Sequence, residues 1–541
     1  MRMKRTIWLW LVVGVWGLVG LAPPPAGAQN EAPTATPRPG GARDPRFGVV
    51  EAFWSPEQAA ALGPGWERIL FYWSEIQPAG PEDWNTLHVL EEWLREADAQ
   101  GRQVVGLLKH TPAWATDGPA FGGVPRGLYL PVEDPDNLWA NYVRRIAAYY
   151  GPLGVHHWII WNEPDIDVDT YGNEFAGSVA DYYRLVKVAY LVMKETDPQA
   201  QIHLAGVTFW HDELAGREQY VQRFLEVAAA DPEAAAHGYF FDYLSLHIYF
   251  RVETVGWIVT RMEEIQASFG LDKPIWIVET NAAPTMDPLW PVERPTFAVD
   301  LAQQAWYIVQ AYALGFAAGA ESIGVYKFSD VLVPPGAESF GLLRADFSER
   351  PAFVAYQTVI EYLQGFTAVA VQETAAYRVV SFTRPGDTVH VLWAREPTAV
   401  TLRFPAGAAA ATLVTALGET APLPAVDGAY LLTLEGARCY DECIIGGPPL
   451  LVVEPRPGDA TPETPAPVPA SPTPFAAPAL VAANTATPFP TPTPLPTATP
   501  LPAPAGADGR MGVGLFLLAG AALLGGVLLL FVWRRLRPAS G

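Results

Sequence analysis

Between residues 45 and 366 the chain alternates short apolar runs with longer amphipathic stretches, and few folds can accommodate that alternation. In Thr86–Gln100, apolar residues recur every three or four positions with charged residues between them, which is typical of a helix with one buried face. The predicted strands are Phe47–Phe53, Arg68–Trp73, Gln103–Leu108, His157–Trp161, Gln201–Gly206, Phe241–His247, Pro274–Val278 and Ser322–Phe328. The predicted helices are Ser55–Leu62, Thr86–Gln100, Asn137–Tyr150, Val179–Thr196, Glu218–Ala230, Val255–Phe269, Phe297–Ala318 and Pro351–Leu363. Strands that are each followed by a helix predict an α/β fold, the (β/α)8 or TIM barrel.

Residues 367–453 have a different pattern, in which short β-prone runs follow one another without a helical period. Tyr377–Thr383 and Thr388–Ala394 flank the sequence Arg-Pro-Gly-Asp, which predicts a hairpin. The further predicted strands are Ala399–Phe404, Ala411–Ala416, Tyr430–Leu434 and Leu450–Val453. We therefore expect a small all-β sandwich domain on the flank of the barrel. Cys439 and Cys443 lie near its end, and in an exported protein they would form a local disulfide. Two free thiols are the alternative.

The two ends of the chain predict export and a membrane anchor. Residues 1–28 have the basic start, apolar run and small-residue cleavage site of a signal peptide, with an uncleaved anchor helix as the alternative. Residues 29–44 are a Pro- and Thr-rich leader, and residues 454–509 are a Pro/Thr/Ala-rich linker. Residues 511–533 carry no charge and precede three arginines in the tail 534–541, which predicts one transmembrane helix. The folded domains would then lie on the extracellular side of the cell membrane.

The net charge of −22 argues against a nucleic-acid partner and would repel an anionic polymer, so we expect a neutral saccharide substrate. Nineteen tryptophans fit such a substrate, because indole rings stack on sugar rings as well as filling cores. The sequence contains no His-Glu-x-x-His motif, phosphate loop or Gly-x-Ser-x-Gly motif. We expect neither a metal nor another cofactor.

The apolar run His157–Trp161 ends abruptly in Asn162-Glu163-Pro164. Pro164 has no backbone donor and favours extended geometry at Glu163, so the strand should stop there. A carboxylate is thereby placed at the carboxyl end of a buried strand, where the catalytic groups of TIM barrels lie. Glu163 is a candidate general acid/base of glycoside hydrolysis; the alternative is a turn glutamate.

A second glutamate ends another buried run in the same way. Glu279 follows Pro274–Val278, which is predicted strand seven, whereas Glu163 follows strand four. The carboxyl ends of these two strands face each other across the mouth of a barrel. Hydrolysis of a glycosidic bond requires two carboxylates that flank the anomeric carbon, so the pair predicts a glycosidase site.

These two motifs together resemble the clan A retaining glycoside hydrolases, which include cellulase-like and β-xylosidase/iduronidase-like families. The similarity covers about residues 45–366, and a following β-sandwich is also typical of several such families. The resemblance implies that Glu163 is the acid/base, Glu279 the nucleophile, and Asn162 a ligand of the sugar 2-hydroxyl. It also implies double displacement with carboxylates about 5 Å apart.

Further residues match the clan. Arg68 on strand two would contact the nucleophile, with a rim salt bridge as the alternative. His247 and Tyr249 form a His-x-Tyr at strand six, in which the Tyr hydroxyl would orient the nucleophile. His110 after strand three would bind sugar or have a structural role. Many members end strand eight with a Trp that this chain lacks, and Phe328 or Trp290 would replace it.

The sequence thus predicts a membrane-anchored extracellular retaining glycoside hydrolase. The alternative is a catalytically inactive barrel that binds glycan or serves as a surface scaffold.

Overall fold

The structure, a computed structural model, describes residues 43–170, 172–333, 337–440 and 442–456. The predicted signal peptide, transmembrane helix 511–533 and tail lie outside these residues, as do most of the leader and linker. Within the described ranges, no helix is both long enough and apolar enough to cross a membrane.

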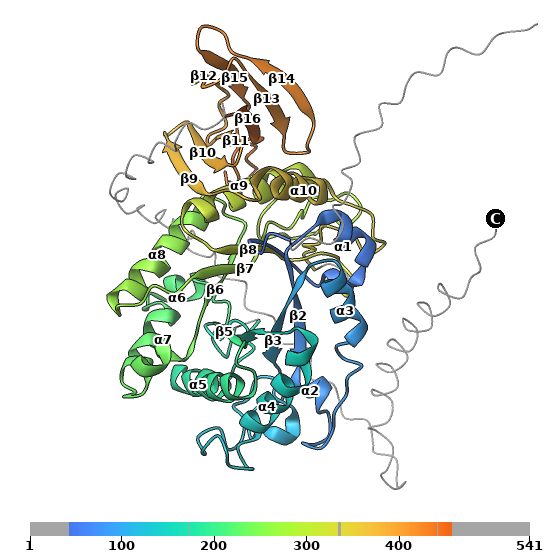
Figure 1. Cartoon of the computed structure of the whole chain (residues 1–541), viewed down its shortest axis with the longest axis vertical. Helices are drawn as coiled ribbons and strands as arrows, with labels where there is room; N and C mark the ends of the chain where they lie inside the picture. Colours follow the sequence, from blue (N-terminus) through green and yellow to red (C-terminus); the bar gives the residue numbers. More distant parts are fainter. Residues whose placement is uncertain (1–42, 171, 334–336, 441, 457–541) are drawn as a thin grey trace, which may run out of the picture. The chain divides into compact units, whose positions relative to one another are not determined.

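Eight parallel strands form the barrel, and helices surround them (Figure 1). The strand order is β5-β4-β3-β2-β1-β8-β7-β6, and isolated parallel bridges from His203 to Tyr243 and from Val207 to Leu246 join β5 to β6. The sheet is therefore closed on itself, as the alternating sequence pattern predicts. The strands are β1 (Phe47–Val50), β2 (Trp66–Tyr72), β3 (Gln103–Lys109), β4 (His157–Ile160), β5 (Gln201–Leu204), β6 (Leu244–Tyr249), β7 (Ile275–Asn281) and β8 (Ser322–Val325).

At least one helix follows every barrel strand, and two helices match their predicted bounds in full. These are α5 (Val179–Thr196) and α10 (Pro351–Leu363). Ser178 and Asp181 form a capping box at the start of α5, and Pro351 is the first residue of α10, so local sequence determines both starts. The others are α1 (Pro56–Leu62), α2 (Trp73–Ile76), α3 (Glu91–Ala99), α4 (Leu138–Tyr150), α6 (Trp210–Ala215), α7 (Tyr220–Ala229), α8 (Thr254–Ser268) and α9 (Leu301–Ala317).

Some predicted elements of the barrel begin too early, and α3 is the clearest case. Helix α3 begins at Glu91 rather than at Thr86, because Leu90 is extended and Leu87 is 77% exposed. Val89 in this segment is buried, but the backbone there forms turns rather than a helix, so periodicity alone misplaced the boundary.

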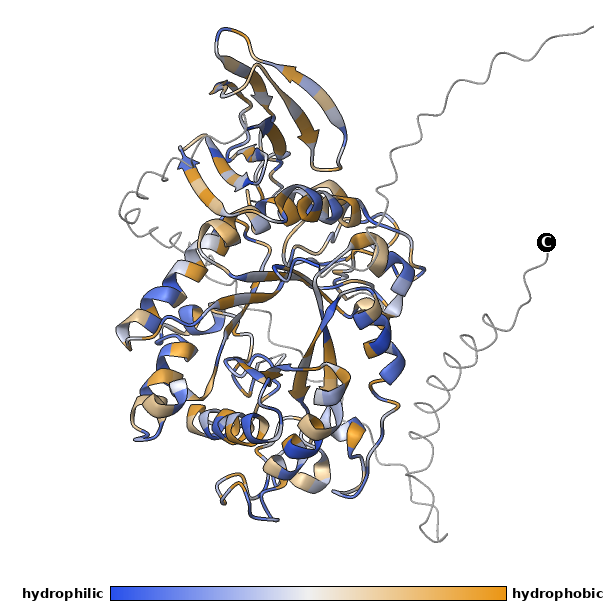
Figure 2. Cartoon of the chain, viewed as in Figure 1, coloured by the Kyte–Doolittle hydropathy of each residue, from blue (hydrophilic) through white to orange (hydrophobic). Residues whose placement is uncertain are grey.

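The barrel has one apolar cluster inside it and another on its outer face. A cluster that includes Trp66, Ile159, Trp276 and Val278 fills the interior, whereas a larger cluster lies between the strands and the helices. Figure 2 accordingly shows hydrophobic colour along barrel strands and mixed colour on the helices. A Cβ atom at Gly48 would lie 1.9 Å from the Trp66 ring, so only glycine leaves room for this indole.

An antiparallel β domain follows the barrel and fits the predicted sandwich. A six-stranded sheet has the order β14-β13-β16-β11-β10-β9, and β12 and β15 form a two-stranded sheet. Sequence analysis missed β9 and β14; the latter carries two prolines and lies at the sheet edge, where a missing N–H is tolerated. The strands are β9 (Ala368–Glu373), β10 (Tyr377–Arg384), β11 (Asp387–Ala394), β12 (Val400–Pro405), β13 (Ala410–Thr415), β14 (Thr420–Pro424), β15 (Ala429–Leu434) and β16 (Leu450–Pro455).

A loop between β15 and β16 connects this domain to the barrel. Cys439 and Cys443 form a disulfide within it, with Cα atoms 4.5 Å apart. The Gln303 side chain of α9 donates to the Arg438 carbonyl at 2.8 Å. The Val252 N–H, which follows β6, donates to the Ile444 carbonyl at 3.0 Å. The loop therefore contacts the segment that follows β6 at the carboxyl end of the barrel.

A buried ion pair at the start of β2 and β3 gives a stability prediction. Arg102 Nε lies 2.9 Å from Glu67 Oε1, and both side chains are almost inaccessible to solvent. We expect Arg102→Ala to lower the free energy of unfolding by about 3–5 kcal/mol, because Glu67 would stay buried without its partner. Urea unfolding measures this loss.

The control is Arg95→Ala on α3, which removes an exposed pair with Glu91. This change should lower the free energy of unfolding by no more than about 1 kcal/mol. Equal losses for the two variants would contradict the burial argument.

Candidate functional site

The turn after β4 presents Glu163 at the mouth of the barrel. Strand β4 ends at Ile160, and Trp161 and Glu163 both have positive φ values, 74° and 41°. The expectation of extended geometry at Glu163 was therefore wrong; the Glu163 N–H instead donates to the Gly206 carbonyl at 3.2 Å. Non-glycine residues adopt such angles at an energetic cost, which the surrounding contacts must offset.

Glu279 reaches the interior through a β-bulge in β7. Leu246 pairs with Ile277, but the next pair is His247 with Glu279, so Val278 has no partner on β6. Regular alternation would direct Glu279 outward, because Trp276 and Val278 point inward. The bulge instead lets two successive side chains, Val278 and Glu279, point into the barrel.

Two side chains, one from the adjacent strand β6 and one from the more distant strand β2, fix the Glu279 carboxylate. Arg68 from β2 forms an ion pair with Oε1, and the Tyr249 hydroxyl from β6 donates to Oε2. Burial by itself would raise the pKa of Glu279, but Arg68, His247 and Tyr249 together hold that pKa below its usual range. Glu279 is consequently ionised at neutral pH.

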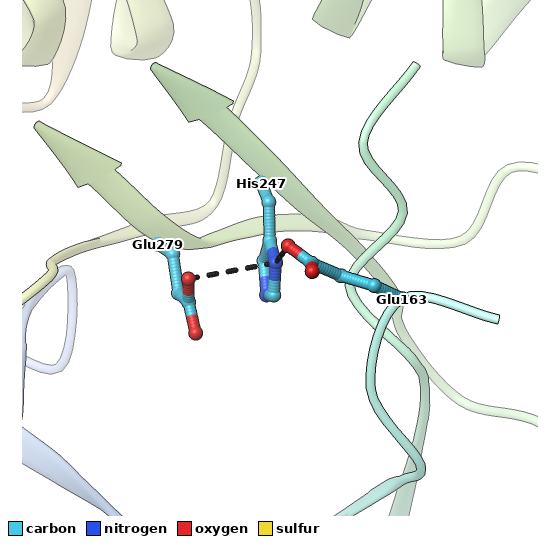
Figure 3. A group of neighbouring side chains, drawn as sticks. All are labelled: Glu163, His247 and Glu279. Carbon is cyan, nitrogen blue, oxygen red and sulfur yellow. Dashed lines mark hydrogen bonds and ion pairs between the residues drawn. The ribbon is translucent and has the colours of Figure 1, made fainter. Parts of the chain in front are cut away.

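His247 lies between the two glutamates (Figure 3). Its Nδ1 is 2.6 Å from Glu163 Oε1 and 3.5 Å from Glu279 Oε2. Burial by itself would lower the pKa of His247, but the two carboxylates raise that pKa above its ordinary value. The ring occupies space left by Gly206, where a Cβ atom would lie 2.1 Å from Nε2. His247 thus contacts acidic groups that are predicted to do the chemistry.

The three side chains form a compact acid–base cluster. One oxygen of Glu163, one oxygen of Glu279 and one nitrogen of His247 all lie within 4.8 Å of one another. A metal ion could bind three such atoms, but it would compete with the proton that the raised pKa of His247 retains. The cluster can hold and transfer protons across a distance suited to one sugar ring.

The other predicted site residues lie in varied surroundings. Asn162 is half-buried, and the structure describes no hydrogen bond of its side chain. His110 stacks on Tyr72 with ring centroids 4.3 Å apart, and burial lowers its pKa to about 3, so its imidazole is neutral. Trp290, in the loop after β7, donates from its indole to the Ala337 carbonyl at 3.1 Å.

Phe328 does not face the mouth of the barrel. Strand β8 ends at Val325, and the Phe328 ring is fully buried near Phe353 of α10, so its position does not support a role in sugar binding. The aromatic residue beside the site is Tyr326, whose ring is 6.1 Å from that of Tyr249.

Sequence analysis also missed two ion pairs at the ends of strands. Lys327 Nζ lies 3.2 Å from Glu51 Oε2, and Lys109 Nζ lies 2.6 Å from Glu174 Oε2. Glu51 and Lys109 stand at or just after the carboxyl ends of β1 and β3. The predicted strands one and eight extend past Glu51 and Lys327, so the sequence did not mark these residues as strand ends, whereas Lys109 directly follows predicted strand three.

Comparison with known proteins bears on the fold. No family model matches the sequence, and no curated protein matches it. The structure is similar to that of a family 39 glycoside hydrolase from Bacteroides cellulosilyticus WH2, with 18% identity and a TM-score of 0.57, over 76% of this chain and 81% of that chain.

Two other solved structures are similar over 77% of this chain and 97% of theirs. They are a GH30 endoxylanase from Clostridium papyrosolvens C71, with 12% identity, and a glucosidase from Croceicoccus marinus, with 13% identity. Both TM-scores are 0.52. The chain therefore shares its fold with these glycoside hydrolases.

Asp165, two residues after Glu163, gives a prediction about pH. Its Oδ2 accepts hydrogen bonds from the Thr208 N–H and hydroxyl, whereas its buried Oδ1 has no partner among the described residues. Burial, with the nearby charge of Glu163, raises the pKa of Asp165 to about 6. Because the folded state retains this proton more strongly than the unfolded state, stability should fall as pH rises from about 4 to 6.

We expect Asp165→Asn to remove that contribution. The free energy of unfolding of the variant, relative to that of the parent, should rise by about 2 kcal/mol between pH 4.5 and pH 7.5. Urea unfolding at the two pH values tests this, with exposed Asp167→Asn as the matched control. The same pH response in parent and Asp165→Asn would contradict the shifted pKa.

Proposed function

We propose that this protein is a retaining glycoside hydrolase in which Glu279 is the nucleophile and Glu163 is the acid/base. The observation that carries the proposal is the geometry of two carboxylates, with one oxygen of each within 4.8 Å of the other. Retaining enzymes hold their carboxylates about 5 Å apart, whereas inverting enzymes leave additional room for water. The fold supports the same conclusion, because the catalytic groups of TIM-barrel enzymes lie at this end of the barrel.

The two glutamates have environments that suit different roles. Glu279 is ionised and oriented by Arg68 and Tyr249, as attack on an anomeric carbon requires. Glu163 is more accessible, with 20% of its side chain exposed, and it shares a hydrogen bond with His247. A proton in that hydrogen bond is available to a leaving group.

The reaction would proceed in two steps. Glu279 forms a bond to the anomeric carbon while Glu163 transfers a proton to the departing glycosidic oxygen. Glu163 then takes a proton from a water molecule, whose oxygen displaces Glu279 and releases the sugar with its original configuration. Arg68 limits the basicity of Glu279 and so makes it a better leaving group in the second step.

The substrate is proposed to be an oligo- or polysaccharide outside the cell. Solved structures with this fold include an endoxylanase and a glucosidase, so β-xylosides and β-glucosides are the first substrates to test. The proposed location at the cell surface depends on the sequence patterns of residues 1–28 and 511–533.

Removal of each glutamate should have a distinct chemical result. With an aryl β-glycoside, Glu163→Ala and Glu279→Ala should each lose at least about 100-fold in kcat, the lower range for acid–base catalysis. Added azide should react through the space left by the carboxylate. Glu163→Ala should form the β-glycosyl azide, whereas Glu279→Ala should form the α-glycosyl azide, and NMR distinguishes the two products.

Glu264→Ala is the control, because this residue lies on the exposed face of α8 in a pair with Arg261. It should retain full activity. Unchanged hydrolysis by both glutamate variants, or no hydrolysis by the parent on any glycoside, would contradict the proposed enzyme and favour an inactive glycan-binding barrel.

A further inference from the structure

Polar side chains beyond the catalytic pair line the lip between β8 and β3. Glu51 follows β1 with a left-handed backbone, φ 61°, and its N–H donates to the Arg68 carbonyl at 3.0 Å. Its carboxylate pairs with Lys327, and only 13% and 10% of the two side chains are exposed. Desolvation of an ion pair costs free energy, so stability alone does not account for this pair.

Two tyrosines place this ion pair next to the nucleophile. Tyr326 is near both Glu279 and Glu51: burial raises the pKa of its phenol, and both carboxylates raise it further. Tyr72 lies on the other side, where burial and then the charges of Glu51 and Glu174 raise the pKa of its phenol. Geometry supports this proximity for Tyr326: its ring centre is 6.0 Å from Lys327 Nζ and 6.1 Å from the ring of Tyr249, which donates to Glu279.

The hydroxyls of these two tyrosines are available to a ligand. The hydroxyls of Tyr72 and Tyr326 make no hydrogen bond among the described residues. Neither hydroxyl is among the buried polar atoms that lack a partner, so both are accessible. Each phenol can donate one hydrogen bond and accept others. Together with the carboxylate of Glu51 and the ammonium of Lys327, these hydroxyls form a polar wall. Contacts within the protein do not use all of the hydrogen-bond donors and acceptors of this wall.

The charges at this end of the barrel are already balanced. Opposite charges pair as Lys327–Glu51, Lys109–Glu174, Arg68–Glu279 and His247–Glu163. Each cation of these four pairs already has a carboxylate partner, so a sugar carboxylate would add a negative charge that none of them is free to pair with, and its desolvation would oppose binding. Neutral hydroxyl groups match the wall better, because a diol can donate to a carboxylate and accept from an ammonium.

We propose that Glu51 and Lys327, with the phenols of Tyr72 and Tyr326, bind the hydroxyl groups of a neutral sugar ring next to Glu279. This inference rests on the proposed glycosidase function, and it names the substrate class as neutral glycosides rather than uronides. Glu51 and Lys327 are its specificity-determining residues.

The first test compares 4-nitrophenyl β-D-xyloside, β-D-glucoside and β-D-glucuronide. The parent should hydrolyse its better neutral substrate with a kcat/KM at least about 100-fold above that for the glucuronide. Glu51→Gln should lower kcat/KM for the neutral substrate by about 10- to 100-fold, the usual effect of losing a hydrogen bond to a charged group. Glu264→Gln on α8 is the matched control and should change nothing.

A charge-swapped double variant separates recognition from structure. Glu51→Lys with Lys327→Glu preserves an ion pair but exchanges donor and acceptor. It should recover the Tm lost by Glu51→Gln without recovering kcat/KM. Recovery of kcat/KM along with Tm would show a merely structural pair and overturn the inference, as would a preference for the glucuronide.

Binding distinguishes failure of this inference from failure of the proposed function. If the parent hydrolyses no glycoside, the enzyme proposal fails. The affinity of the protein for xylobiose and cellobiose, measured by calorimetry, then tests the sugar-binding role of Glu51 and Lys327 directly. Affinity that falls at least about 10-fold in Glu51→Gln would support the wall. Absence of binding to the parent, or equal binding to both proteins, would overturn it.

Discussion

The ion pair between Arg68 and Glu279 is the interaction on which the site depends. Both side chains lie inside a closed barrel, where an unpaired carboxylate would be expensive to bury. The bulge at Val278 places Glu279 within reach of that guanidinium, because the regular strand would direct it toward the helices. One extra residue in β7 thus determines which face of the sheet carries Glu279, the proposed nucleophile.

Backbone strain is concentrated at the same end of the barrel. Glu51, His110, Trp161 and Glu163 all have positive φ values and follow the carboxyl ends of β1, β3 and β4. Such conformations persist where surrounding packing determines them, and they cluster at functional sites. The opposite end contains the satisfied pair Glu67–Arg102. The barrel therefore has a buried ion pair at one end and a strained backbone at the end that carries the candidate site.

Periodicity predicted the barrel because every strand and helix has to bury one face, and that requirement is local in sequence. It also predicted which residues would meet, since strand ends in a barrel share one lip. It could not predict the bulge at Val278, or the left-handed turn at Glu163, because both depend on contacts between strands. The position of Phe328 has the same cause: β8 ends at Val325, so Phe328 is buried near α10, whereas the Tyr326 ring lies beside Tyr249 of the candidate site.

The central claim is that Glu279 bonds covalently to the sugar. A 2-deoxy-2-fluoro-β-glycoside with a reactive leaving group tests it, because the fluorine slows release of the intermediate more than a good leaving group slows its formation. Peptide mass spectrometry of the inactivated protein should locate one fluorosugar on the peptide that contains Glu279. A sugar attached to another residue, or turnover with inverted configuration and no adduct, would contradict the account.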